Sequence, residues 1–373
     1  MDKNLLIVAG DPSGDLHAAN LVRALKAQDP ELRVVALGGR HLKEVSDHFL
    51  FDLASLGISG FLEPLKRGLL WSRLLHTVRN TLQSGRISAV VCVDFYGFNH
   101  QVLGMAKHRH IPTFYYISPQ VWASRPGRVR KLARLVDHML LIFPFEVDLY
   151  QKAGVPCTFV GHPLLDIVPE PSAGAKEAFS SSDPVRIGLL PGSRPSEIDR
   201  HLPLLLETLD RIRAAFPKAQ AELFAAANLD DDAFRPALNG ARGISIVRES
   251  RYEKRAGLDL ALTCSGTATL ENALLGVPMV VMYKVSAPTY WIAKALVRVP
   301  YIALANILLN KPLLPELIQS DATPEKVAKE AVRILSDPER LGGMRRELID
   351  LRERLGRPGA AQRAAAVILE KLS

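Results

Sequence analysis

Continuous apolar runs of about five residues recur along this chain and predict buried strands. Such runs are typical of central strands in a parallel sheet, because helices cover both of its faces. The runs lie at residues 5–9, 33–37, 89–93, 113–117 and 138–142, and then at residues 186–190, 221–225, 244–247, 258–263 and 278–283. Segments of helical periodicity separate them, as at residues 16–27 and 268–275. The alternation predicts an α/β fold with two doubly wound parallel sheets.

Residues 56–75 depart from this pattern. Their apolar side chains are dense, glycines and a proline interrupt them, and the cations are Lys66, Arg67 and Arg73. One interpretation is a core helix with an exposed charged face. The other is an apolar surface with a basic rim that lies against a membrane or holds an acyl chain. In the second interpretation the surface consists of Phe61, Leu62, Leu65, Leu69, Leu70 and Leu74.

Small-residue turns follow three of the predicted strands, at the edge where a doubly wound sheet binds its ligands. Their sequences are Gly10-Asp11-Pro12-Ser13-Gly14-Asp15, Pro191-Gly192-Ser193-Arg194 and Ser265-Gly266-Thr267. Turns of this kind let a phosphate approach free backbone N–H groups at the start of a helix. The turn at Ser265-Gly266-Thr267 is also compatible with an ordinary strand–turn–helix in which a hydroxyl only caps the helix. Arg194 either clamps a diphosphate or pairs with Glu197.

Two carboxylates stand beside these turns. Glu271 lies four residues after Thr267, so the two share a helix face, and Glu271 can accept hydrogen bonds from the hydroxyls of a ribose. Asp94 follows the strand at residues 89–93, where a general base belongs in this architecture. The alternative for Asp94 is a loop residue that caps the next helix.

Length and composition limit the possible classes. A chain of 373 residues predicts two domains. We place an N-terminal domain at residues 1–168, a linker rich in Pro, Ser, Ala and Gly at residues 169–184, and a C-terminal domain at residues 185–350. The net charge of +8 suits an anionic partner, although no zinc-finger or aromatic-rich basic motif favours nucleic acid.

The three cysteines are isolated, which favours a reducing compartment and gives no zinc-site spacing. No uncharged apolar window reaches 18 residues, and the N-terminus enters a strand directly, so we expect neither a transmembrane helix nor a signal peptide. We also expect no metal and no cofactor. Asp94 would then deprotonate an acceptor hydroxyl while Arg194 and backbone N–H groups stabilise a departing diphosphate. This division of labour predicts an inverting, metal-independent glycosyl transfer.

The order of these motifs resembles the lipid-A-disaccharide synthase family, whose members are glycosyltransferases of the two-domain GT-B fold. The resemblance rests on the three turns above, on Glu271, and on further stretches in family-like order. These are Asp94…Phe98-Asn99, Tyr116-Ile117-Ser118-Pro119-Gln120-Val121-Trp122-Ala123, Pro144-Phe145-Glu146, Gly161-His162-Pro163 and Pro278-Met279-Val280-Val281.

The resemblance implies two Rossmann-like domains that face a cleft, with residues 351–373 returning to the first domain. It also implies transfer of 2,3-diacylglucosamine from its UDP derivative to 2,3-diacylglucosamine 1-phosphate, which gives the β-1,6-linked disaccharide 1-phosphate of lipid A and UDP. Asp94 and Ser13 match active-site residues. The substrate-binding set is Arg194, Ser193, Ser265, Gly266, Thr267, Glu271, Asn306, Glu316, Gln319 and Asp15. The resemblance favours the membrane interpretation of residues 56–75, and with it a cytoplasmic enzyme held peripherally at the inner face of the inner membrane.

The chain departs from the family at several positions. Asp11 stands where many members have Glu, and Tyr96-Gly97 replaces the more usual Pro-Asp. Ser124 stands where Trp is frequent, and Ala305 precedes Asn306 where Pro is common. Two rivals stay open: a UDP-GlcNAc transferase that acts on a polyprenyl-linked peptidoglycan precursor, and a non-catalytic protein that binds nucleotide sugars. Residues 56–75 argue against a third, a UDP-GlcNAc 2-epimerase, because that enzyme needs no lipid surface.

Overall fold

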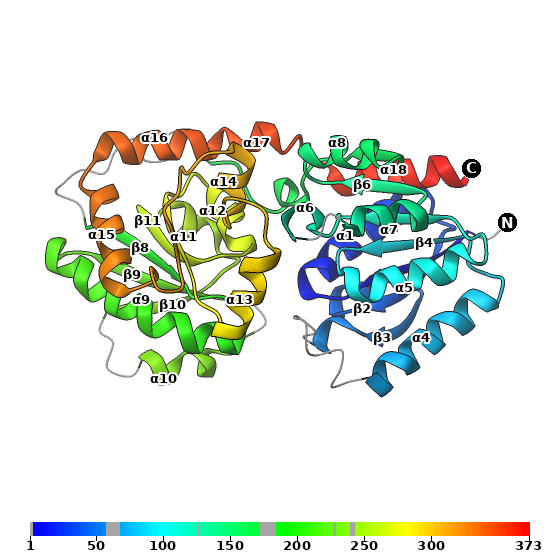
Figure 1. Cartoon of the computed structure of the whole chain (residues 1–373), viewed down its shortest axis with the longest axis horizontal. Helices are drawn as coiled ribbons and strands as arrows, with labels where there is room; N and C mark the ends of the chain where they lie inside the picture. Colours follow the sequence, from blue (N-terminus) through cyan, green and yellow to red (C-terminus); the bar gives the residue numbers. More distant parts are fainter. Residues whose placement is uncertain (1–2, 57–67, 125–126, 172–183, 227–228, 239–242) are drawn as a thin grey trace. The chain divides into compact units, whose positions relative to one another are not determined.

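The computed structural model describes residues 3–56, 68–124, 127–171, 184–226, 229–238 and 243–373. The chain divides into two compact units (Figure 1). Unit 1 comprises Met1–Asp166 and Leu355–Ser373, and unit 2 comprises Ile167–Arg354. Each unit is built on one parallel sheet with helices on its faces, which confirms the predicted α/β fold.

The sheet of unit 1 has the strand order β3-β2-β1-β4-β5-β6-β7, and all its pairings are parallel. Its strands are β1 (Asn4–Ala9), β2 (Arg33–Gly38), β3 (His48–Asp52), β4 (Ala89–Val93), β5 (Thr113–Tyr116), β6 (His138–Leu141) and β7 (Cys157–Phe159). The central strands β1 and β4 are almost wholly buried, as their apolar runs predict. The order reverses between β1 and β4, which makes that position the topological switch point.

The sheet of unit 2 follows the same principle, with the parallel order β10-β9-β8-β11-β12-β13. Its strands are β8 (Arg186–Leu190), β9 (Gln220–Ala225), β10 (Ile244–Arg248), β11 (Leu260–Cys264), β12 (Met279–Tyr283) and β13 (Glu316–Ile318). Here the switch point lies between β8 and β11.

Three edge strands, β3, β7 and β13, were not predicted. They are short, and most of their residues are only half-buried, so their sequences lack the continuous apolar run that marks a central strand. Glu316 is the first residue of β13.

Helices of unit 1 cover both faces of its sheet (Figure 1). They are α1 (Pro12–Gln28), α2 (Arg40–Val45), α4 (Gly68–Gln83), α5 (Tyr96–Lys107), α6 (Val121–Ser124), α7 (Gly127–Leu135), α8 (Phe145–Lys152) and α18 (Ala360–Leu372), with short 3₁₀ turns at Ala54–Leu56 and Pro163–Asp166. The C-terminal α18 packs against α1. It belongs to unit 1, as the resemblance implies.

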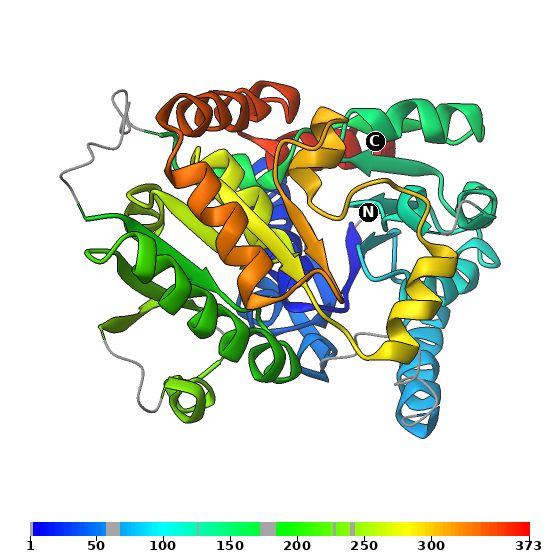
Figure 2. The same cartoon turned by 60° about the vertical axis from the view of Figure 1, so that its left-hand side comes forward.

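In unit 2, α9 packs against α15, and α12 packs against α14, α16 and α17 (Figures 1 and 2). The helices are α9 (Pro195–Ala215), α10 (Arg235–Leu238), α11 (Tyr252–Ala256), α12 (Thr267–Leu274), α13 (Ala287–Leu296), α14 (Leu304–Leu309), α15 (Pro324–Leu335), α16 (Pro338–Ile349) and α17 (Leu351–Arg354), with a 3₁₀ turn at Asp231–Ala233. Among the described residues, no helix is long and apolar enough to cross a membrane.

The proposed apolar surface at residues 56–75 needs correction at Leu74. Leu74 is only 4% exposed and belongs to the core of unit 1, where α4 also buries Val78 and Leu82. Leu70 is partly buried against the same core. Leu69 is 84% exposed and remains a candidate surface residue. Phe61, Leu62 and Leu65 lie outside the described residues.

Candidate active site

The predicted site residues cluster at the switch points of the two sheets. In unit 1, Ser13 lies in the first turn of α1, directly after the loop that follows β1, and Asp94 lies in the loop after β4. In unit 2, the loops after β8 and β11 carry Arg194 and Ser265. Ligands of doubly wound folds bind beyond the carboxyl ends of strands at such points. Each unit thus presents one half-site.

Asp94 stands in a strained backbone turn at the end of β4. Its φ is 45° and that of Phe95 is 42°, so two consecutive non-glycine residues adopt the left-handed conformation. The surrounding side chains fix this turn through the carbonyl oxygen of Asp94. That oxygen accepts hydrogen bonds from the Tyr115 hydroxyl and, at 2.8 Å, from the Asn99 side-chain amide. Because such strain persists only where neighbours enforce it, the half-buried carboxyl group is held in place.

The loops after β1 and β4 lie in close contact. A Cβ atom on Gly10 would lie 1.9 Å from Cδ1 of Phe95, so only glycine fits there. The contact also brings two carboxyl groups near one another. Burial, together with the negative charge of Asp11, raises the pKa of the Asp94 carboxyl to about 7. A carboxylate with this pKa is a competent general base near neutral pH.

Ser13 and Asp15 have different roles in the first turn of α1. Ser13 is exposed at the carboxyl edge of the sheet. Asp15 is buried, and its carboxylate accepts the backbone N–H groups of Gly39, His41 and Leu42 at 2.6, 2.8 and 3.1 Å. Asp15 therefore fixes the loop after β2 and the start of α2, and the prediction that it contacts substrate is replaced by this positioning role.

Glu146 is a further buried acid of unit 1 that the sequence analysis quoted only within a motif. Its side chain is 1% exposed and accepts a hydrogen bond of 3.1 Å from the indole N–H of Trp122. Burial, opposed by the hydrogen bonds from Trp122, Phe143 and Ser118, raises the pKa of the Glu146 carboxyl to about 8. The raised pKa favours the protonated form of Glu146 at neutral pH, and the hydrogen bond from Trp122 ties α6 to the start of α8.

In unit 2, Arg194 and Ser193 project from the loop after β8. The Arg194 guanidinium is 54% exposed and donates to Oε1 of Glu197 at 2.9 Å, while the Ser193 N–H donates to Oε2 of the same carboxylate at 3.0 Å. Glu197 therefore fixes the conformation of this loop. From the sequence, Glu197 was only an alternative partner for Arg194. Gly192, at φ 121°, allows the loop to approach Cys264 at the end of β11.

The turn Ser265-Gly266-Thr267 leads directly into α12. Its Gly266 forms the N-cap without a side-chain hydrogen bond, and no atom lies within 4 Å of the position a Cβ would take there. The Ser265 hydroxyl donates to the Ile302 carbonyl at 3.2 Å. An open helix N-terminus without a capping side chain can bind an anion through its own N–H groups.

Glu271, one turn further along α12, is held by a network that the sequence analysis missed. Its carboxylate accepts the Arg255 guanidinium at 2.7 Å and the Tyr252 hydroxyl at 3.1 Å. Arg255 is fully buried and also donates to Oδ1 of Asn272 and to the carbonyls of Ala268 and Glu249. The charged sequence around Arg255 gave no signal of burial, because such a stretch is typical of a solvated face.

Asn306, Glu316 and Gln319 are joined to backbone groups. The Asn306 amide donates to the Leu314 carbonyl at 2.9 Å and to Glu316 at 2.8 Å. The Glu316 carboxylate also accepts the N–H groups of Ile302 and Ala303. Gln319 exchanges two hydrogen bonds with the backbone of Val285. These residues fix the segments that follow β12, including the Ile302 carbonyl that Ser265 contacts.

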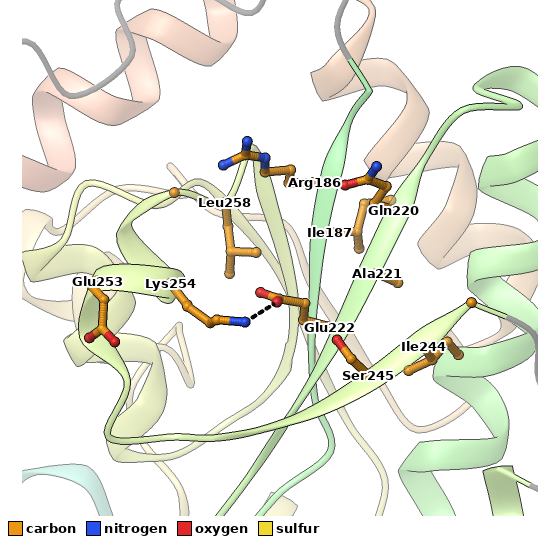
Figure 3. A pocket seen from close by; sticks show the side chains of 12 residues that line it. Arg186, Ile187, Gln220, Ala221, Glu222, Ile244, Ser245, Glu253, Lys254 and Leu258 are labelled. Carbon is orange, nitrogen blue, oxygen red and sulfur yellow. Dashed lines mark hydrogen bonds and ion pairs between the residues drawn. The ribbon is translucent and has the colours of Figure 1, made fainter.

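A hollow of about 680 Å³ lies at the opposite edge of the unit 2 sheet (Figure 3). Arg186, Gln220 and Ile244, which line it, are the first residues of β8, β9 and β10. The Lys254 ammonium bonds to Glu222 at 2.9 Å within it. Because it opens at the amino ends of the strands, this hollow is separate from the half-site at Arg194 and Ser265. Within the described ranges, no three His, Cys, Asp or Glu side chains gather so that they could hold a metal ion.

Comparisons with known proteins give a family match over nearly the whole chain. The family model described as lipid-A-disaccharide synthetase matches residues 5–370. A lipid-A-disaccharide synthase of Geobacter metallireducens is 41% identical, over 100% of this chain and 98% of that protein. One from Myxococcus xanthus is 37% identical, over 99% and 97% of the two chains.

Solved structures with a similar fold are more distant in sequence. A putative UDP-N-acetylglucosamine 2-epimerase from Listeria monocytogenes has a TM-score of 0.66 at 13% identity, covering 100% of this chain and 97% of that one. The glycotransferase of kitacinnamycin has a TM-score of 0.62 at 18% identity and covers 99% of both chains. At these identities the likeness shows the fold alone.

Proposed function

We propose, from the premise that this chain belongs to the lipid-A-disaccharide synthase family, that it transfers 2,3-diacylglucosamine from UDP-2,3-diacylglucosamine to 2,3-diacylglucosamine 1-phosphate. The products are the β-1,6-linked disaccharide 1-phosphate and UDP. The observation that carries the proposal is that each unit has candidate ligand-binding groups at its own switch point: a carboxylate with a raised pKa in unit 1 and anion-binding groups in unit 2.

Unit 2 holds the donor in this proposal. The N–H groups at the start of α12 and the Arg194 guanidinium face the diphosphate, and they stabilise the charge that grows on it as the glycosidic bond to UDP breaks. Ser193, Ser265, Gly266 and Thr267 supply the turns that admit the phosphates. Glu271, oriented by Arg255, accepts the hydroxyls of the ribose.

Unit 1 holds the acceptor. Asp94 takes the proton from the 6-hydroxyl of the acceptor as that oxygen attacks the anomeric carbon of the donor. One direct displacement inverts the anomeric centre and gives the β-linkage. Ser13, exposed beside Asp94 in the first turn of α1, contacts the acceptor. Both lipid substrates belong to the inner leaflet of the inner membrane, so we place the enzyme there as a peripheral protein with Leu69 as one contact.

A mass-spectrometric transfer assay tests the reaction. Purified protein receives UDP-2,3-diacylglucosamine and 2,3-diacylglucosamine 1-phosphate, with and without EDTA. We expect the disaccharide 1-phosphate and UDP, in equal amounts whether or not EDTA is present. A product that disappears with EDTA would contradict the assignment of the leaving-group charge to Arg194 and the backbone. UDP binding without any product would refute this acceptor, and the polyprenyl-linked acceptor would be assayed next.

A further inference from the structure

Helix α13 of unit 2 stands out because none of its described side chains is buried. A helix of an α/β domain ordinarily buries an apolar stripe against its own sheet. Trp291 is instead 64% exposed, and Val297, one residue beyond the helix, is 41% exposed. The yellow α13 lies apart from the helices that cover the sheet of unit 2 (Figure 2).

The sequence around α13 carries charge of a single sign. From residue 272 to residue 310 it contains no Asp and no Glu, whereas it contains Lys284, Lys294 and Arg298. The next cation, Lys311, pairs with Glu347. Lys294 lies on the same helix as the aromatic side chains, with its ammonium 5.4 Å from the ring centre of Trp291 and 5.9 Å from that of Tyr290. An exposed tryptophan, a half-buried tyrosine and a lysine are therefore combined on one short helix.

We propose that α13 and the turn after it are a membrane-contact surface of unit 2, and that its partner is an anionic lipid bilayer. Trp and Tyr have an apolar body with a polar edge and favour the boundary between headgroups and acyl chains. Lysine and arginine beside them attract anionic headgroups while their stems lie along the apolar layer. A protein partner fits less well, because lysine is depleted in protein interfaces.

This surface is distinct from Leu69, which lies in unit 1. It also does not depend on the transfer reaction, since a bilayer recognises the exposed side chains and not the catalytic groups. Within the proposed function it would bring the donor-binding unit to the layer in which a diacylated donor resides.

Tryptophan fluorescence with brominated lipids tests the proposal directly. Full-length protein is mixed with phosphatidylcholine vesicles, with and without phosphatidylglycerol, that contain bromine-labelled acyl chains. Trp71 packs against Phe98, and Trp122 bonds to Glu146, so we expect the exposed Trp291 to give the larger part of the quenching, and Trp71, two residues from Leu69, a smaller part. Quenching should require phosphatidylglycerol. It should fall by more than half in Trp291→Phe, whose phenyl ring keeps most of the vesicle affinity in a sedimentation assay.

Two further variants test the energetic contribution. Trp291→Ser combined with Val297→Ser should lower vesicle affinity at least about tenfold, because apolar area no longer enters the bilayer. Lys294→Gln should weaken binding to the anionic vesicles, whereas Lys218→Gln, at an exposed position elsewhere in unit 2, should not. UDP affinity measured by calorimetry should match the wild type in all of them, which shows that unit 2 is folded.

Three results would overturn the proposal: no vesicle binding by the wild-type protein, quenching as strong in Trp291→Phe as in the wild type, or unchanged affinity in the double serine variant. The first result would mean that another segment of the chain or a protein covers α13. The second would place the membrane contact on another part of the protein. Failure of UDP to bind the wild-type protein would refute the proposed function alone, because the vesicle measurements do not use UDP.

Discussion

Asp94 combines backbone strain with a raised pKa, and both are measurable. Two left-handed non-glycine residues cost on the order of 1–3 kcal/mol each, so the fold expends stability to place this carboxyl group. As a base, Asp94 acts only when ionised. We therefore predict that kcat/KM rises with pH through an apparent pKa of about 7.

Asp94→Asn should lower turnover at least about a hundredfold and leave UDP affinity unchanged. Turnover near the wild-type level would remove Asp94 from the mechanism.

A substitution at Asp11 can change the pKa of Asp94 without replacing Asp94 itself. The negative charge of Asp11 is one cause of the raised pKa of Asp94, so Asp11→Asn should lower that pKa and shift the rising limb of the pH–rate profile to lower pH. The Asp11 side chain also caps α1 by accepting the Gly14 N–H at 2.5 Å. Asparagine caps about as well, so the melting temperature should be unchanged. A limb that stays in place, or moves to higher pH, would contradict the coupling.

Arg255 is the residue on which the position of Glu271 depends. Arg255→Met would leave the Asn272 oxygen and two carbonyls without their buried partner, and we expect unit 2 to lose about 2–5 kcal/mol. UDP affinity should fall about tenfold, since Glu271 loses a charge-assisted hydrogen bond. The matched control is Arg251→Met, because Arg251 is exposed and pairs with Glu253. Calorimetry and thermal denaturation separate the two effects. A folded Arg255→Met protein with normal UDP affinity would refute the positioning role.

The sequence located residues at strand ends more reliably than it assigned their roles. Asp94, Arg194 and Ser265 were predictable because an apolar run shows where a strand ends, and ligands bind there. The positioning roles of Asp15 and Asn306 were not predictable, because they depend on which backbone groups lie nearby in three dimensions.

At the scale of elements, central strands were predictable from the sequence and edge strands were not. β1, β4, β8 and β11 carry continuous apolar runs because both faces of each are covered. β3 and β13 are half-exposed edge strands whose pairing depends on a neighbour far away in sequence. For α4, helical spacing allowed either a core or a surface role, and the burial of Leu74 settles that residue as core.

The contact between the loops after β1 and β4 can be tested as one unit. Gly10→Ala would place a Cβ against the Phe95 ring, so we expect a loss of about 1–3 kcal/mol in stability together with lower turnover, because Phe95 adjoins Asp94. Gly97→Ala is the control, since open space surrounds Gly97 in the next helix. In a Phe95→Ala background the effect of Gly10→Ala should shrink. Equal effects in both backgrounds would contradict the contact.

At the scale of the whole chain, the polypeptide leaves unit 1 after Asp166 and returns at Leu355. The returning segment is tied down by specific bonds. The Gly359 and Ala360 N–H groups donate to Asp166, and the Arg363 guanidinium donates to the Val160 carbonyl at 2.8 Å. Alanines on one side of α18 are buried in unit 1, where α18 packs against α1. Unit 1 is therefore completed only by the last residues of the sequence.

Adjacent alanines of α18 test whether this return stabilises unit 1. Ala365 is buried and Ala366 is exposed, so the same substitution at each places a carboxylate inside or outside the packed face. We predict that Ala365→Glu lowers the thermal transition of unit 1 by the equivalent of about 3 kcal/mol or more, because the buried charge has no partner, while Ala366→Glu changes it by less than about 0.5 kcal/mol. Glycosyl transfer should fall in Ala365→Glu alone. UDP binding, which we assign to unit 2, should persist in both variants, as measured by calorimetry. Equal melting curves for the two variants would show that α18 contributes little to unit 1.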